Sequence, residues 1–290
     1  MKTLVLNSSN VDPNDTSRYI YRFPAGGASL AGKEIAVAAI SLYYSWFNIS
    51  TALNNKIFRY VFYSGAGPTA TTITVTIPDG FYTAAQLNAY LQSVMIANGH
   101  YLVTSTGDFV YFLEIVENPT AYAIQFNSYA LPTSAQATAN SWTAPVGWPG
   151  FVTTNITPQI IILPTNNFGN IIGFNAGTYP SPTQITDYSK ISDFTPQFSP
   201  VQSVLLRCNV VNNRLSNPSD IIYSFAPVNV DFGSIISPAI SEFIWNSIDE
   251  GQNQPEFIVQ FLDQSFSPLP LRDTNLVIVL SIRDKQDRRM

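Results

Sequence analysis

Apolar and polar residues alternate with a period of two along much of both ends of the chain. Arg18-Tyr19-Ile20-Tyr21-Arg22-Phe23 is one such stretch, and this period places alternate side chains on opposite faces of a β-strand. Patterns of this kind predict strands at residues 18–23, 34–47, 56–63, 72–77, 109–116, 122–126, 159–163, 204–211, 221–225, 240–245, 257–262 and 276–282.

The last predicted strand differs from the others because it is almost continuously apolar. Residues 276–282 read Leu-Val-Ile-Val-Leu-Ser-Ile, so apolar side chains would point to both faces of the sheet. We therefore expect this strand to be buried on both faces.

One helix is predicted from local signals at both of its ends. Thr83 stands at the N-cap position and Gln86 follows three residues later, which is the spacing of a capping box. Asn98-Gly99 marks the expected end of the helix. Its apolar stripe, spaced for packing against a core, consists of Leu87, Tyr90, Leu91, Val94 and Met95.

The rest of the middle block is less regular. Residues 129–158 are rich in Ala, Thr, Ser, Pro and Trp and are predicted to form an extended loop, which usually belongs to a contact surface. Residues 168–174 are expected to form a short helix or turn. Residues 179–200 contain four prolines and are expected to be a return linker.

Strands at both ends and a helix-containing block between them predict an all-β protein, one β-sandwich that carries a small α-containing insertion. We assign residues 1–68 and 190–290 to the sandwich and residues 69–189 to the inserted helix-plus-hairpin domain. Residues 1–17 are polar and contain Pro13, so we expect an N-terminal arm that becomes ordered only against a neighbouring copy.

The basic residues are distributed unevenly along the chain. The 130 residues between Arg59 and Lys190 contain no lysine or arginine, whereas the remainder holds all 14 basic residues. The formal charge of −5 therefore falls within this middle segment, which coincides closely with the predicted insertion. Its acidic residues are Asp79, Asp108, Glu114, Glu117 and Asp187.

The composition favours a folded β protein with covered surfaces. Charged residues make up 11% of the chain, against about 25% in a typical protein, and aromatic residues make up 13%. The single cysteine excludes an internal disulfide and favours folding in the cytosol. The N-terminus does not read as a signal peptide, and the longest apolar run, residues 35–44, is shorter than the roughly 20 residues of a membrane helix.

The sequence offers no catalytic set. His100 is the one histidine, which excludes a metal site with several histidines; next to the helix end, it is expected to interact with the helix dipole. Cys208 is expected to be a small buried hydrophobe. Glu114 and Glu117, three apart on a strand, point to opposite faces and so do not form a glycosidase pair. We predict no enzyme, no cofactor and no metal.

Nucleic acid is not expected as a main partner, because phosphate binding needs clustered Lys and Arg. The one basic cluster is the tail at residues 283–289, where two aspartates dilute the charge. A frayed C-terminus is the simpler interpretation of this tail, and a contact with nucleic acid is the alternative.

Aromatic residues in the middle block are candidate surface contacts. Tyr129, Trp142 and Trp148 have no basic neighbours, unlike the aromatic residues of a base-stacking groove. They would contact a host receptor or a carbohydrate. The alternative is that they pack the core of the insertion.

Several stretches, in order, resemble one family. Ile77-Pro78-Asp79-Gly80-Phe81-Tyr82, followed by Leu87-Asn88 in the helix, resembles the strand-turn-helix unit of penton (minor capsid) proteins of virophages and polinton-like viruses. Residues 168–174, Phe-Gly-Asn-Ile-Ile-Gly-Phe, are similar to the family's Leu-Leu-Gly-Phe element. Residues 205–209 resemble the strand that follows it, and residues 260–264 with Arg272-Asp273 and 276–283 resemble the family's C-terminus.

The resemblance, from about residue 15 to 285, implies a single jelly roll with an inserted upper domain. It implies a homopentamer at the fivefold vertex of an icosahedral capsid, beside trimers of a double jelly-roll major capsid protein. The insertion would face outward and the jelly roll would meet the neighbours, so we expect all 14 basic residues to lie on the jelly roll.

We therefore predict a structural capsid protein, a penton located in the virion and made in the host cytoplasm. The first alternative is a jelly-roll module that binds a receptor or carbohydrate, as in a spike or lectin. The second is a β-sandwich glycosidase, which requires two facing carboxylates about 5 to 9.5 Å apart.

Overall fold

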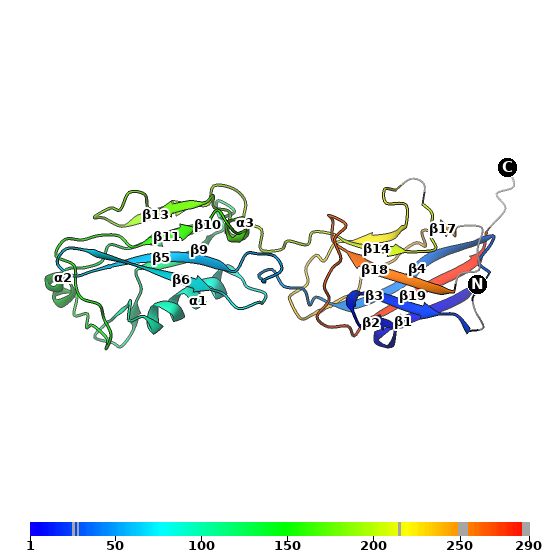
Figure 1. Ribbon diagram of the computed structural model, residues 1–290, viewed down its shortest axis with the longest axis horizontal. Coiled ribbons are helices and arrows are strands. Elements are labelled where there is room, and N and C mark those ends of the chain that lie inside the picture. Colours follow the sequence, from blue (N-terminus) through cyan, green and yellow to red (C-terminus); the bar gives the residue numbers. More distant parts are fainter. Residues whose placement is uncertain (25–26, 28, 214–215, 249–254, 286–290) are drawn as a thin grey trace. The chain divides into compact units, whose positions relative to one another are not determined.

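The computed structural model describes residues 1–24, 27, 29–213, 216–248 and 255–285 (Figure 1). The chain forms two compact units. Unit 1 comprises Met1–Trp46 and Val201–Met290, and unit 2 comprises Phe47–Pro200. No helix in the described part of the chain is long and apolar enough to cross a membrane.

The described residues of unit 1 form two antiparallel sheets. The β4 sheet contains, in order, β1 (Lys2–Asn7), β19 (Val277–Asp284) and β4 (Lys33–Tyr43), with the short strands β16 (Ile235–Ile236) and β17 (Asn246–Ser247) along β4. The β18 sheet contains, in order, β15 (Ile221–Phe225), β14 (Val204–Cys208), β18 (Glu256–Leu262), β3 (Asp15–Arg22) and β2 (Val11–Asp12). A 3-10 turn, η1 (Ser8–Asn10), connects β1 to β2.

The strand order of unit 1 is that of a jelly roll. Along the chain the eight strand positions are β1, β3, β4, β14, β15, the β16/β17 pair, β18 and β19. In one sheet these positions lie in the order first, eighth, third and sixth. In the other sheet the order is second, seventh, fourth and fifth. This double-sheet order confirms the predicted fold class. Unit 2 is inserted between the third and fourth strands.

The N-terminal residues belong to this sandwich, which corrects the prediction of an arm ordered only by a neighbour. β1 pairs with β19 from Lys2↔Ile282 to Asn7↔Val277. Leu6 is fully buried. Because alternate residues of β1 face the core, this strand gains both hydrogen bonds and apolar burial within its own chain.

The strand predicted at residues 240–245 does not form. β16 and β17 flank this stretch instead, and each pairs with one end of β4. The side chains of Phe243 and Ile244 are 43% and 61% exposed, so these apolar residues do not contribute to the core.

Unit 2 contains three sheets and three helices. One sheet has the order β12 (Gly177–Tyr179), β11 (Gln159–Ile162), β5 (Ile57–Ser64) and β6 (Thr69–Thr76); a second has β13 (Tyr188–Ile191), β10 (Ala123–Ser128) and β9 (Leu113–Asn118); the third pairs β7 (Leu102–Val103) with β8 (Phe109–Val110). The helices are α1 (Ala84–Ala97), α2 (Ser134–Ala139) and α3 (Phe168–Ile172).

The boundaries of unit 2 lie outside the predicted boundaries of 69 and 189. β5 pairs with both β6 and β11, and β13 pairs with β10, so residues 47–68 and 190–200 also belong to unit 2. Unit 2 therefore includes three basic residues, Lys56, Arg59 and Lys190, beside six acidic ones, a formal charge of −3. The expectation that all 14 basic residues lie on the jelly roll is wrong.

The helix predicted from local signals is confirmed as α1. Thr83 and Gln86 make the capping box in both directions, and Leu87, Leu91 and Met95 are buried. The predicted loop at 129–158 is interrupted by α2, which has its own capping box between Thr133 and Gln136. That second box was readable in the sequence, but α2 has a single buried residue and so lacks an apolar stripe that would have indicated a helix.

Asn48, at the start of unit 2, forms hydrogen bonds with two other segments of the unit. Its fully buried side chain donates from Nδ2 to the carbonyl oxygens of Tyr82 (2.8 Å) and Phe198 (2.9 Å), and Oδ1 accepts from the Tyr82 N–H at 2.9 Å. The Asn48 carbonyl accepts from Asn55 Nδ2 at 2.8 Å. One side chain thus joins the entering chain, the start of α1 and the return segment.

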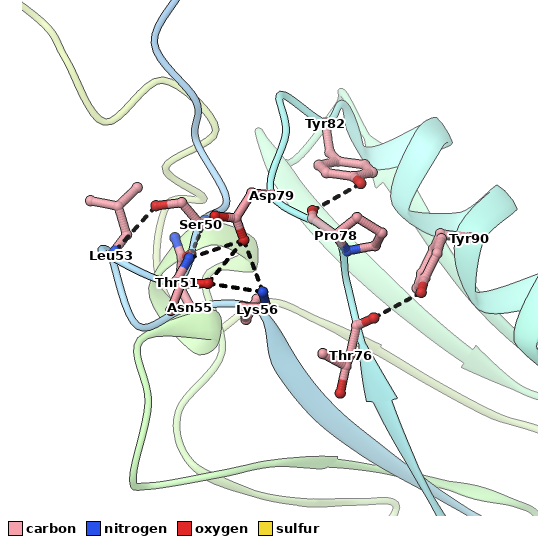
Figure 2. Close-up of polar contacts among 10 residues, drawn as sticks. All are labelled: Ser50, Thr51, Leu53, Asn55, Lys56, Thr76, Pro78, Asp79, Tyr82 and Tyr90. Carbon is pink, nitrogen blue, oxygen red and sulfur yellow. Dashed lines mark hydrogen bonds and ion pairs between the residues drawn. The ribbon is translucent and has the colours of Figure 1, made fainter. Parts of the chain in front are cut away.

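Figure 2 shows the polar contacts between the segment after Asn48 and the Pro-Asp-Gly turn before α1. One oxygen of Asp79, Oδ1, accepts from Lys56 Nζ at 2.9 Å and from the N–H and hydroxyl of Thr51 at 3.1 Å. The hydrogen bond from Lys56 lowers the pKa of Asp79. The Tyr82 hydroxyl donates to the Pro78 carbonyl at 3.0 Å, so the Pro-Asp-Gly turn is held from both sides.

We predict that Asn48→Ala lowers the free energy of unfolding by about 3 kcal/mol, because it leaves buried backbone groups without partners. Chemical denaturation followed by tryptophan fluorescence measures this change. Asn170→Ala, at an exposed position of α3, is the matched control and should unfold like the unmodified protein. Equal stability of the two variants would contradict this role of Asn48.

Candidate interaction surfaces

The outer face of the β4 sheet carries several apolar residues, interspersed with Asn7 and Ser41. Along β19, Ile278 and Leu280 point into the core and are fully buried, so the alternate residues Val277 and Val279 point outward. Val277 is 42% exposed and Val279 is half-buried. The prediction that this strand is buried on both faces is therefore wrong for the single chain, in which only one face is covered.

This apolar surface continues across neighbouring strands. Val5 on β1 lies opposite Val279, which lies opposite Ala39 on β4. Tyr43 lies opposite Ile235 on β16. Val5 and Ile235 are 50% and 53% exposed. We call this surface the apolar face; it consists of Val5, Ala39, Tyr43, Ile235, Val277 and Val279.

Charged residues lie at one end of the apolar face and not within it. Arg283 pairs with Glu34 at 3.0 Å, and its guanidinium lies 3.9 Å from the ring centre of Trp245. The outer face of a solitary antiparallel sandwich is normally polar. An exposed apolar patch with a charged rim is typical of a protein interface.

The outer face of the β18 sheet has the opposite character. Arg207 donates twice to Asp220, at 2.8 and 2.5 Å, and Gln260 Nε2 donates to Asp15 at 2.9 Å. Further ion pairs join Arg18 to Asp12 and Arg22 to Glu256, each at 3.6 Å. Such partly exposed pairs contribute at most about 1 kcal/mol each, so they shape surface chemistry more than stability.

A pocket of about 250 Å³ opens on this charged face. It is lined by Asp15, Arg18, Arg207, Asn209, Asp220, Ile258 and Gln260. Because its acids and its arginines already hydrogen-bond or ion-pair within the chain, the pocket presents little unpaired charge to a ligand.

The three aromatic residues proposed as contacts are half-buried and pack against the core of unit 2. The Tyr129 hydroxyl donates to Glu114 at 2.8 Å; burial, with a smaller contribution from Glu114, raises the pKa of Tyr129 to about 12. The ring centre of Trp148 lies 5.6 Å from that of Phe62. Trp142 also packs on this core. Their use as receptor or carbohydrate contacts stays a prediction.

His100 is a buried, neutral residue, so the expected interaction of a charged imidazole with the helix dipole is absent. Its ring stacks on Phe62 with centres 4.0 Å apart, and its Nδ1 lies 2.9 Å from the Tyr60 hydroxyl. Burial lowers the pKa of His100 to about 4. An uncharged imidazole gains nothing from the dipole, so its role is to pack the core of unit 2.

The other candidates for chemistry are also accounted for by packing. Cys208 is fully buried, and burial raises the pKa of its thiol to about 12, so it is not a thiolate nucleophile. Among the residues that the structure describes, no three His, Cys, Asp or Glu side chains are placed to hold a metal ion. Of the basic tail at 283–289, residues 286–289 lie outside the described residues.

No protein-family model matches the chain, and no curated protein sequence matches it. Among solved structures, the chain is similar to the mavirus penton protein, with 9% identity, a TM-score of 0.43, and coverage of 97% of this chain and 96% of that chain. It is also similar to a chain in the cryo-EM structure of the Sputnik virophage, with 12% identity, a TM-score of 0.38 and 98% coverage of both chains. The fold assignment rests on the strand pairing of unit 1.

We predict that His100 makes stability depend on pH between 6.5 and about 4. The unfolded chain takes up a proton below pH 6.5 and the folded chain does not, so stability falls as the pH drops through this window, by at most about 1.4 kcal/mol per unit. His100→Asn should flatten that slope in denaturation curves.

Asp79→Asn is the control for this measurement. The folded-state pKa of Asp79 lies below the ordinary value of 3.8, so this variant should leave the slope above pH 4.5 unchanged. An unchanged slope in His100→Asn would show that the buried imidazole does not carry the effect.

Proposed function

We propose that this protein is a structural protein of a viral capsid, a penton whose five copies form the fivefold vertex of an icosahedral shell. The observation that carries the proposal is the apolar face. A sandwich whose core is already complete leaves this second apolar surface in water, and such a surface is stabilised when another protein covers it.

A five-membered ring needs a heterologous interface, in which two different surfaces of each copy meet. The apolar face supplies one of them. The second is formed by exposed apolar residues between β15 and β17, where Val228, Phe243 and Ile244 are 67%, 43% and 61% exposed. These two apolar surfaces of neighbouring copies cover each other, and the charged face of the β18 sheet stays outside the contact.

The remaining features fit the same role. Stretches that resemble the motifs of the penton family occur in order along the chain. In the capsid, unit 1 meets trimers of a double jelly-roll major capsid protein, and unit 2 is the outward domain, available to a host receptor. The protein is located at the virion vertex and is made in the host cytoplasm.

We predict that the purified chain forms five-membered rings, visible by mass photometry and negative-stain electron microscopy. Val277→Lys should raise the concentration at half-assembly at least tenfold, because it buries an unpaired charge at the contact, and tenfold corresponds to only about 1.4 kcal/mol. The position is exposed in the single chain, so the variant should remain folded.

Ile185→Lys is the matched control. It introduces the same charge at an apolar residue of unit 2 that is 66% exposed and is not part of the apolar face, and it should assemble like the unmodified chain. A protein that stays monomeric at high concentration would overturn the proposal. Equal assembly of both lysine variants would remove the apolar face from the interface.

A further inference from the structure

β6 is a terminal strand with an open edge. It pairs with β5 from Ile57↔Thr76 to Ser64↔Thr69 and is the last strand of its sheet. Val75 is its one buried residue, and Ile73 is half-buried. Its sequence, Thr-Ala-Thr-Thr-Ile-Thr-Val-Thr, contains no charged residue and no proline.

The register shows which backbone groups face the open side. The N–H of Ile77 donates to the Lys56 carbonyl at 2.8 Å, and antiparallel ladders alternate between bonded and non-bonded pairs. Thr71, Ile73 and Val75 therefore bond to β5, whereas Ala70, Thr72 and Thr74 direct both backbone groups away from it.

An independent contact supports this assignment. The Tyr90 hydroxyl on α1 donates to the Thr76 carbonyl at 2.7 Å (Figure 2), so Thr76 also faces the open side and has its partner there. No hydrogen bond in the described part of the chain engages the outward N–H and C=O groups of Ala70, Thr72 and Thr74.

β6 lacks the devices that normally protect an edge strand, such as charge, proline or a covering helix. Both terminal strands of the β13-β10-β9 sheet have them. β13 carries Lys190, and β9 carries Glu114 and Glu117 and packs against α1, whose Asn88 accepts from the Ile115 N–H at 2.9 Å. An unprotected edge is a template for pairing with another strand.

We propose that β6 is a strand-pairing surface and that its partner is β6 of a second copy of this chain. In an antiparallel register centred on Thr72, Thr72 lies opposite its counterpart and Ala70 lies opposite Thr74 of the other copy. This register bonds all three outward residues on each copy. No parallel or shifted register of the same strands uses every outward group.

The surrounding charges permit this contact. The one charged side chain among the strands of this sheet is Arg59, which stands on β5 opposite Thr74 and not at the edge itself. The facing side chains are Thr against Thr and Ala against Thr, so no like charges oppose each other. The six acidic residues of unit 2 lie outside these strands.

This pairing is separate from the ring contact. It uses unit 2, it is two-fold, and it would join two copies whether or not each belongs to a ring. A single strand edge is a small interface, well below the roughly 1,200 Å² of a stable complex. We therefore expect it at high protein concentration, as paired rings if the chain forms rings.

Sedimentation of the full chain over a concentration series tests the proposal. Thr72→Pro removes one outward N–H, and proline is tolerated at such a position of an edge strand. Thr72→Lys sets two charges directly opposite each other. Both should weaken the pairing at least tenfold, whereas Thr72→Val, which keeps the backbone groups, should change it by less than about threefold.

Amide hydrogen exchange provides a second readout that does not depend on substitutions. The N–H groups of Ala70, Thr72 and Thr74 should become protected as concentration rises, while the exchange of Tyr122, an exposed turn residue, stays constant. Intact rings in Thr72→Pro would show that the ring and the pairing are independent. No association beyond the ring, equal association of the Pro and Val variants, or unprotected β6 amides would each overturn the pairing.

Discussion

Pairing between strands from opposite ends of the chain is the constraint on which the rest of the structure depends. β19 pairs with β1 and β4, and β18 pairs with β3, so residues before Phe47 are joined to residues after Pro200. The insertion is therefore one closed loop of the jelly roll. Loop closure costs only about 0.6 kcal/mol for each doubling of length, so a long insertion is tolerated when it folds by itself. Asn48 assists by bonding the entering chain to the return segment at Phe198.

Each unit completes its own core, but each also leaves groups exposed that another protein could cover. In unit 1 the sandwich buries the inner faces of both sheets, but Val5, Val277 and Ile235 remain in water on the outer face. In unit 2 the sheet ends at β6, whose outward backbone groups have no strand beside them. Protein interfaces commonly bury apolar area, and some also pair free backbone groups at a sheet edge. Both proposals follow from this division.

The segment without basic residues is shorter than unit 2, although the two were expected to coincide. The gap in basic residues does not coincide with unit 2, because unit 2 also includes Lys56 before β5, Arg59 on β5 and Lys190 on β13. Unit 2 is still sparsely charged, and its aromatic residues are explained mainly by packing on its core. The gap therefore indicated an inserted block correctly and its limits incorrectly, since charge does not decide where a strand finds its partner.

The sequence by itself determined the features that depend on neighbours along the chain. The capping box of α1, its buried stripe and the alternation of β3, β9 and β10 required no distant contact. Tertiary structure decided the rest. β1 is a strand because β19 lies beside it. Residues 240–245 are not a strand because β4 pairs with β16 and β17, which flank them. One face of β19 is exposed because only one sheet covers it. Periodicity shows that a face is apolar, but only the fold shows whether its own chain covers that face or leaves it for another.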